Sequence, residues 1–268
     1  MNVAASSTTD LIIAEKREGV GYLRFNRPEK HNAISYEMWQ GIAKVMAVFE
    51  EDDTVRAVVV SGEGGRAFSA GADISQFEKQ RASADAIKGY NVASGLAHEK
   101  LTNISKPTIA KIAGYCIGGG LGIALCCDLR FATDDSKFGI PAAKLGLGYG
   151  YGGLKPLVGL VGPIRAKEIL FTARQFDASE AYDMGLINRV LSKDEIDAFV
   201  DEYTETIAGN APLTIKACKQ IIAEVCKDPD DRDLELCKQL VDACFASEDY
   251  KEGRRAFMEK RKPQFHGR

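Results

Sequence analysis

Three consecutive glycines, Gly118, Gly119 and Gly120, could expose backbone N–H groups that bind a ligand. They follow an apolar run at 108–113 that is typical of a buried strand, and they precede an apolar segment at 121–127 that is typical of a short buried helix. A strand, a glycine turn and a helix start leave free backbone N–H groups pointing at one spot, where the helix dipole adds partial positive charge. This turn suits a developing oxyanion or a phosphate. The alternative is a tight turn that serves only close helix packing.

A second junction of the same kind lies earlier in the chain. Residues 66–74, RAFSAGADI, follow a strand-like run at 57–61 and a glycine-rich loop at 62–65. Asp73 or Ser75 could cap a helix that runs into the eighties. The junction would then offer backbone N–H groups around Ala72, and two such junctions can hold one carbonyl oxygen from two sides.

Four motifs in order, FSAGADI, IAGYCIGGG, CCDLRFAT and SKFGIP, resemble the crotonase (enoyl-CoA hydratase/isomerase) superfamily over about residues 11–265. The resemblance implies an α/β fold, a spiral of repeated β-β-α units with a helical C-terminal region. It also implies an enzyme that acts on an acyl-CoA thioester. By this resemblance, the backbone N–H groups of Ala72 and Gly119 match the pair that polarises the thioester carbonyl and stabilises an enolate.

The resemblance also implies residues that contact coenzyme A, which needs an apolar slot for its adenine and cations near its phosphates. Ala70, Ala72 and Ile74 match the path of the adenine and pantetheine. Lys30 and His31 lie in the loop after NRP, where the family places a CoA contact.

Two further CoA contacts are implied near the C-terminus. Phe257 and Lys260 match positions of the family's closing helix that reach CoA, commonly across a subunit interface. A solvated helix charge is the alternative for Lys260. The family's helical region packs against neighbouring subunits, so we expect a homotrimer or a hexamer.

The sequence departs from the hydratase pattern at two positions. Hydratases of this family carry one glutamate three residues beyond the oxyanion-hole glycine, where this chain has Gly122, and another after the proline of FGxP, where it has Ala142. Neither residue can orient water or exchange a proton. The enzyme could therefore be hydratase-like with other acid/base groups, or an isomerase. It could instead be a decarboxylase or β-keto-acyl-CoA hydrolase, or a non-catalytic paralogue that binds acyl-CoA.

Tyr149 is the candidate for the missing acid/base group. It lies in the glycine-rich stretch GLGYGYGG, where certain decarboxylases of the family carry a tyrosine near the substrate carboxylate. A phenol donates a hydrogen bond without being charged, and it can protonate an enolate if its pKa is tuned. The alternative is an aromatic ring that packs under the loop.

Strand-like and helix-like segments alternate through residue 133, which predicts an α/β class with parallel strand pairing. We expect a hairpin from strands at 11–15 and 20–26, and then a helix at 36–51 capped by Ser35. A loop with a short helix is expected at 139–162. The further helices expected lie at 163–172, 178–184, 194–208, 212–227, 231–246 and 248–260. We therefore divide the chain into a spiral core at 1–191 and a helical trimerisation region at 192–268.

The composition and charge of the chain argue against several classes of function. The chain has 268 residues and a net charge of −3, with scattered Lys and Arg, which does not suggest nucleic-acid binding. No apolar run is as long as a membrane helix requires, and the first ten residues do not resemble a signal peptide. Seven cysteines without a CxxC and three separated histidines suggest no metal site. We expect a cytoplasmic protein that needs no cofactor beyond the CoA of its substrate.

Overall fold

The computed structural model of the chain describes residues 10–76 and 83–268. Its strands form two sheets. The larger sheet has the order β1 (Ile12–Arg17), β2 (Val20–Phe25), β3 (Ala57–Gly62), β5 (Thr108–Ile112), β7 (Leu129–Thr133) and β10 (Arg189–Leu191). The smaller sheet has the order β4 (Ala67–Ser69), β6 (Tyr115–Ile117), β8 (Lys137–Gly139) and β9 (Phe176–Asp177).

Consecutive strands from β3 to β8 alternate between the two sheets. Their pairing within each sheet is parallel, and only β1 with β2 and β8 with β9 pair antiparallel. The first three strand pairs are each followed by a helix that leads back to the larger sheet, whereas the helix after β7 and β8 leads to β9 of the smaller sheet. This arrangement confirms the expected α/β spiral of β-β-α units.

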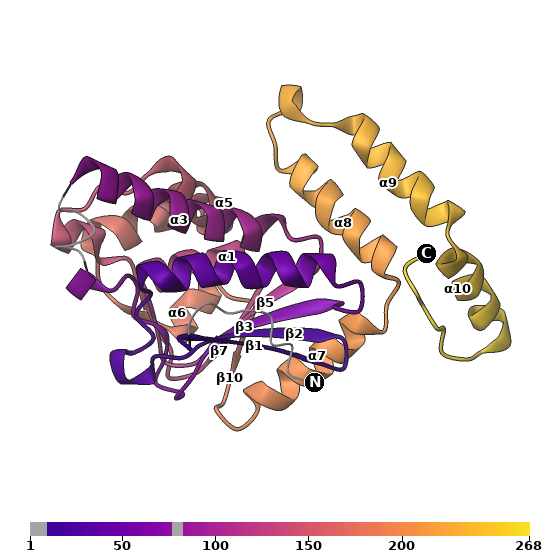
Figure 1. The fold of residues 1–268 in the computed structure, drawn as a ribbon, viewed down its shortest axis with the longest axis horizontal. Coiled ribbons are helices and arrows are strands. Elements are labelled where there is room, and N and C mark those ends of the chain that lie inside the picture. Colours follow the sequence, from indigo (N-terminus) through magenta and orange to yellow (C-terminus); the bar gives the residue numbers. More distant parts are fainter. Residues whose placement is uncertain (1–9, 77–82) are drawn as a thin grey trace.

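Helices cover both faces of the larger sheet. The α-helices in the described residues are α1 (Tyr36–Glu51), α3 (Ala84–Asn103), α4 (Gly119–Cys126), α5 (Tyr151–Thr172), α6 (Ala178–Asp183), α7 (Ile196–Ala208), α8 (Pro212–Val225), α9 (Leu234–Ala246) and α10 (Glu248–Glu259). Figure 1 shows α1 and α3 together on one side of the strands. On the other face, Ile196 and Val200 of α7 pack against Val59, Ile109 and Phe131.

The helix at 36–51 begins and ends where the sequence predicts. The Ser35 hydroxyl accepts a hydrogen bond from the Met38 N–H at 3.3 Å, which satisfies a free donor of the first turn. Its apolar side chains are buried against the core. The next helix differs from the prediction. The 3-10 turn η2 (Ile74–Gln76) follows Asp73, and α3 begins at Ala84 behind the cap Ser83. The part of that prediction at 77–82 lies outside the described residues.

The predicted break at Pro163 is also present. Helix α5 has a non-helical residue, Gly162, with φ of 73°, so its two halves are separate helical segments. The second half coincides with the helix expected at 163–172.

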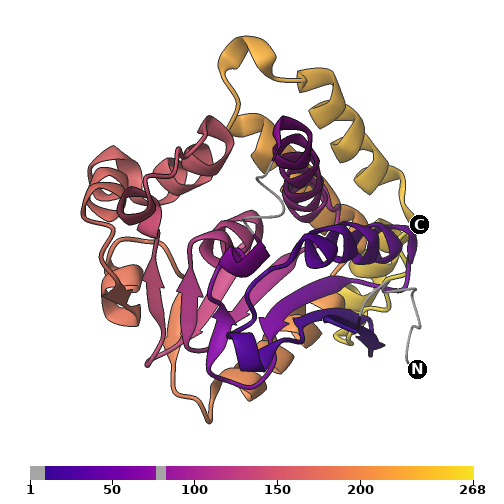
Figure 2. The same ribbon diagram turned by 60° about the vertical axis from the view of Figure 1, so that its left-hand side comes forward.

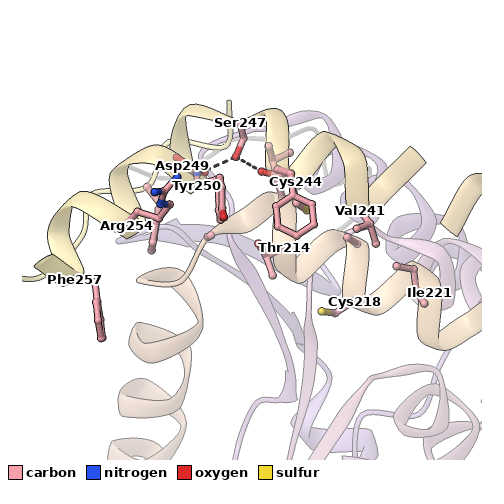
Figure 3. A pocket seen from close by; sticks show the side chains of 16 residues that line it. Thr214, Cys218, Ile221, Val241, Cys244, Ser247, Asp249, Tyr250, Arg254 and Phe257 are labelled. Carbon is pink, nitrogen blue, oxygen red and sulfur yellow. Dashed lines mark hydrogen bonds between the residues drawn. The ribbon is translucent and has the colours of Figure 1, made fainter. Parts of the chain in front are cut away.

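The helices expected beyond residue 192 are confirmed as α7 to α10, with ends that shift by up to three residues. Helix α7 packs on the sheet, whereas α8, α9 and α10 stand apart from the rest of the chain in Figure 1. The functional division at residue 191 stays a prediction. An apolar groove runs between these last three helices (Figure 3), and its apolar lining includes Leu213, Ile221, Val241, Phe245, Phe257 and Phe265. In the part of the chain that the structure describes, no helix combines the length and the hydrophobicity of a membrane span.

Helix α4 lies against β4 because Gly120 has no side chain. A Cβ atom on Gly120 would lie 2.4 Å from the Ser69 carbonyl oxygen and 2.7 Å from the Ser69 Cβ. Neither is the movable end of a flexible side chain. The start of α4 is therefore fixed against the end of β4 by backbone contact.

Replacing Gly120 by alanine should lower the free energy of unfolding by about 1–3 kcal/mol, because the added methyl overpacks this contact. Urea unfolding of the purified protein measures the change. Gly89→Ala is the matched control, because a Cβ there meets nothing within 4 Å in the middle of α3. This control should gain about 0.5–1 kcal/mol from the better helix propensity of alanine. Equal stability of the two variants would contradict the contact.

The other end of α4 is held by Arg130 of β7. The Arg130 side chain is buried and donates hydrogen bonds to the carbonyl oxygens of Cys127 at 2.6 Å, Leu186 at 2.7 Å and Ala124 at 3.3 Å. The Ala124 carbonyl lies in the last turn of α4, the Cys127 carbonyl directly follows this helix, and the Leu186 carbonyl lies shortly before β10. One side chain thus ties the helix to the larger sheet.

Arg130→Met should destabilise the protein by about 3 kcal/mol, since it removes the donors of three carbonyl oxygens in a buried environment. Guanidinium unfolding monitored by circular dichroism checks this. Arg165→Met serves as control, because Arg165 is exposed and forms only a surface ion pair with Glu168, which should change stability by about 0.5 kcal/mol or less. A loss no larger than that of the control would show that Arg130 does not anchor α4.

Candidate active site

Two strand-to-helix junctions meet at one edge of the smaller sheet. β4 pairs in parallel with β6, so the chain leaves both strands at the same edge. After β4 it continues through Gly71 and Ala72, and after β6 it continues through Gly118 into α4. A Cβ on Gly119 would lie 3.4 Å from the Ala72 backbone nitrogen, and a Cβ on Gly71 would lie 3.3 Å from the Gly119 backbone nitrogen. The structure thus brings Ala72 and Gly119, the two expected oxyanion-hole residues, into backbone proximity.

Where the two junctions meet, the backbone adopts conformations at residues 71 and 118 that favour glycine. Gly71 has φ of 100° and Gly118 has φ of 53°, and residues with a side chain are strained in such conformations. The Gly118 N–H donates to the Gly139 carbonyl of β8 at 2.8 Å, which fixes the turn to the third strand of the sheet. The loop after β4 is fixed by Ile34, whose N–H donates to the Gly71 carbonyl at 2.7 Å.

The amides of Ala72 and Gly119 are available to a ligand. Among the residues that the structure describes, neither N–H donates a hydrogen bond to a protein group. Gly119 is the first residue of α4, where free N–H groups and the helix dipole together favour negative charge. Two such donors close together can stabilise an oxygen that gains negative charge during a reaction.

Asp73 anchors the loop that carries Ala72. Its carboxylate is 6% exposed. One carboxylate oxygen, Oδ2, forms ion pairs with the Arg27 guanidinium at 2.9 Å and with the Lys30 ammonium at 3.8 Å. Burial alone would raise the pKa of this carboxyl, but the hydrogen bond from Ser75 and the Arg27 guanidinium outweigh burial and hold the pKa below its usual range. Asp73 therefore stays ionised and acts as a structural support.

Four expected CoA contacts lie beside this loop. The His31 carbonyl accepts a hydrogen bond from the Ala70 N–H at 2.9 Å, so the loop after β2 is docked on the loop after β4. Lys30 and Ala70 are exposed, and Ile74 is 59% exposed. The structure gathers Lys30, His31, Ala70 and Ile74 around Ala72, and their contact with CoA stays a prediction.

Phe257 and Lys260 are not brought to this site within one chain. They lie at the end of α10, on the opposite side of the molecule from α5 in both views (Figure 1, Figure 2). Phe257 is 82% exposed at the edge of the apolar groove (Figure 3), and Lys260 is exposed. The expectation that they reach CoA in a neighbouring copy stays a prediction.

The two positions at which the family resemblance leads us to expect glutamates lie on α4 and just after β8. Gly122 is one turn into α4, and Ala142 is in the 3-10 turn η3 (Pro141–Leu145) with 8% exposure. Neither position offers a group that can take up or give a proton.

Tyr149 lies two residues before α5, and its ring covers Gly153. A Cβ on Gly153 would lie 2.7 Å from the Tyr149 Cε1, and the ring packs at the edge of the main core. Burial, and to a smaller extent the Cys126 thiol, raise the pKa of the phenol above its usual value. Tyr149 is therefore protonated at neutral pH. The expected position of its hydroxyl near the thioester oxygen stays a prediction.

One further group, His98 of α3, is not predicted by any sequence motif. Its Nε2 is buried without a hydrogen-bond partner among the described residues, 3.6 Å from where a Cβ of Gly122 would lie. A lone histidine in a helix carries no signal of proximity to a glycine 24 positions later, so only the packing of α3 on α4 reveals it.

A metal site is not present in the described part of the chain, since no three His, Cys, Asp or Glu residues there are placed to hold an ion. The described groups can do two kinds of chemistry. Two amides can polarise a carbonyl, and a phenol or an imidazole can transfer a proton.

The chain is similar to known proteins over nearly its whole length. The family described as enoyl-CoA hydratase/isomerase matches residues 15–268. A crotonyl-CoA hydratase of Syntrophomonas wolfei is 34% identical over 254 residues, which cover 95% of this chain and 97% of that protein. A short-chain-enoyl-CoA hydratase of Clostridium acetobutylicum is 35% identical over 253 residues, which cover 94% and 95%.

The fold is also similar to that of a solved structure. An enoyl-CoA hydratase/carnithine racemase from Magnetospirillum magneticum superposes with a TM-score of 0.91 at 35% identity, covering 97% of each chain. The family match spans nearly the whole chain, and the spiral fold accords with it. The chain belongs to the enoyl-CoA hydratase/isomerase family of enzymes, the crotonase superfamily.

Proposed function

We propose that this protein is an enoyl-CoA hydratase-like enzyme that holds the carbonyl oxygen of an acyl-CoA thioester between the amides of Ala72 and Gly119. The observation that carries the proposal is the backbone proximity of these two residues, with neither N–H donating to a described protein group. Relatives with 34–35% identity named as hydratases support the same substrate class.

The physical role of the two amides is to stabilise an enolate. When a proton leaves the carbon next to the thioester, or a carboxyl group leaves it as carbon dioxide, negative charge moves to the carbonyl oxygen. Fixed N–H donors at that oxygen need no reorganisation when the charge develops, and removal of one such donor typically lowers turnover by about 10²–10³-fold.

The proton carrier differs from that of an ordinary hydratase. Two carboxylates would orient water and exchange protons at the two carbons of a double bond, and neither Gly122 nor Ala142 provides one. Isomerisation is one alternative, and decarboxylation or β-keto-acyl-CoA hydrolysis assisted by Tyr149 is another. A non-catalytic acyl-CoA-binding role is the third, although it leaves both preserved junctions without a chemical purpose.

The proposed CoA site combines two copies of the chain. Lys30, His31, Ala70 and Ile74 would contact CoA from the subunit that carries the thioester site, and Phe257 and Lys260 would contact it from a neighbour. The apolar groove between α8, α9 and α10 supports assembly into a homotrimer or hexamer, since such surfaces mark interfaces. We also propose a cytoplasmic location, which the seven free thiols support.

A turnover screen over enoyl-, malonyl- and β-keto-acyl-CoA thioesters tests the function. We expect turnover of at least one class, and Gly119→Pro should abolish it, because proline removes the N–H at a helix position that tolerates proline. Gly119→Ala keeps the donor and is the matched control, which should retain more turnover than the proline variant.

Acyl-CoA binding measured by calorimetry separates binding from chemistry. Binding without turnover of any thioester would favour the non-catalytic role. Equal turnover of Gly119→Pro and the unmodified protein would rule out the amide of Gly119 as a catalytic donor.

Tyr149→Phe should lower turnover of the best substrate by about 10²-fold or more, if the neutral phenol donates a proton or a hydrogen bond to the acyl group. Affinity for CoA should stay nearly unchanged, because only the hydroxyl is removed. Tyr151→Phe is the matched control, since Tyr151 is 77% exposed. Unchanged turnover of Tyr149→Phe would assign Tyr149 to packing.

A further inference from the structure

The His98 side chain has an unusual environment for a polar group. Its Nε2 is buried and makes no hydrogen bond to any described residue. A buried polar atom without a partner destabilises the folded protein, so native proteins keep few of them without a functional reason. The ring packs on Trp39 of α1 with 5.1 Å between centroids. The Trp39 indole N–H is itself fixed by a 2.9 Å hydrogen bond to the Tyr90 hydroxyl.

The unpaired nitrogen points at the position that lacks a glutamate. A Cβ on Gly122 would lie 3.6 Å from Nε2, so the imidazole faces the side of α4 from which a side chain at 122 would project. Gly122 lies three residues after Gly119, which places the two on one face about one helical turn, ~5 Å, apart along the axis. Nε2 therefore lies near the α4 start that supplies the Gly119 amide.

The surroundings of His98 keep its ring neutral. Burial, which outweighs the effect of the Ser94 backbone one turn earlier on α3, lowers the pKa of His98 below its ordinary value, so the ring is neutral at pH 7. A neutral imidazole has a proton on one ring nitrogen and a lone pair on the other. With the proton on Nδ1, the lone pair lies on the unpaired Nε2.

We propose that His98 is the proton acceptor of the acyl site, and that its Nε2 takes a proton from the substrate carbon next to the thioester carbonyl in place of the carboxylate that Gly122 cannot supply. This inference rests on the proposed acyl-CoA function. A glycine at 122 is then required, because any side chain there would lie between the imidazole and the acyl group.

The proposed step is balanced within the site. The C–H bond of the substrate breaks, its proton forms a bond with Nε2, and the electron pair becomes the enolate whose oxygen accepts the Ala72 and Gly119 N–H bonds. If the imidazolium exchanges this proton for one from solvent and returns the solvent proton to the same carbon, the outcome is exchange with solvent. If it returns a proton to another carbon of the acyl chain, the outcome is isomerisation.

Exchange of the α-protons of butyryl-CoA in D₂O, followed by proton NMR, tests this step without knowledge of the natural reaction. The unmodified protein should catalyse the exchange. His98→Gln keeps the approximate size and polarity but removes the base, and it should slow exchange by about 10²-fold or more. Butyryl-CoA affinity measured by calorimetry should stay nearly unchanged. His266→Gln, a histidine near the C-terminus, is the matched control and should exchange at the unmodified rate.

Two readouts separate a base from a structural histidine. Exchange by the unmodified protein should be full above the lowered pKa of His98 and be lost as the pH falls through it, and His98→Gln should lack this step. Trp39 of α1, which packs on the imidazole, does not titrate. Cys126 of α4 donates a hydrogen bond to the Gly122 carbonyl, and Tyr149 before α5 interacts electrostatically with Cys126. Burial raises the pKa of both groups, so they stay neutral in this range. Added imidazole should also restore exchange to His98→Ala.

The outcomes distinguish this inference from the proposed function. Equal exchange by His98→Gln and the unmodified protein would overturn the role of His98 and leave the acyl-CoA function standing. Binding of butyryl-CoA with no exchange by the unmodified protein would overturn the base role as well, and so would a flat pH profile, which needs no variant. Absence of any acyl-CoA binding would overturn the proposed function together with this inference.

Discussion

The close backbone approach between the loop after β4 and the start of α4 is the constraint on which the rest of the site depends. Gly71 and Gly120 have no room for a side chain, because a Cβ would lie 2.9 Å from the Ile117 carbonyl oxygen in the first case and 2.4 Å from that of Ser69 in the second. Asp73 and Arg27 hold one side of this contact, and Arg130 holds the far end of α4. Contacts between backbone atoms thus fix the positions of the Ala72 and Gly119 amides.

Helix α4 has a second close approach, to the side chain of His98. A Cβ on Gly122 would lie 3.6 Å from the His98 Nε2. In the proposed account, this neutral base replaces the carboxylate that the family resemblance leads us to expect at position 122. A carboxylate becomes neutral when it takes up a proton, whereas an imidazole becomes a cation beside the enolate. In a site with little water, that attraction stabilises the charged intermediate more than it would in solution.

Sequence reasoning was accurate where the signal is local. The Ser35 cap and the apolar periodicity predict α1 to the residue, and the glycines at 118–120 identify a helix start with free N–H groups. The spiral and the pairing of Ala72 with Gly119 followed from the family resemblance, since no periodicity encodes them. The start of α3 behind Ser83 and the proximity of His98 to Gly122 were missed. Both depend on how distant segments pack, and a single sequence does not record that packing.

The polarisation of a bound thioester carbonyl tests the central claim most directly. Infrared difference spectra of an acyl-CoA labelled with ¹³C at the carbonyl report the strength of the hydrogen bonds to that oxygen, independently of the reaction catalysed. The two amides of Ala72 and Gly119 should shift the carbonyl stretch of bound acyl-CoA well below its value in water, and Gly119→Pro should reverse most of the shift. A bound carbonyl that absorbs at the frequency of the free thioester in water would contradict the account.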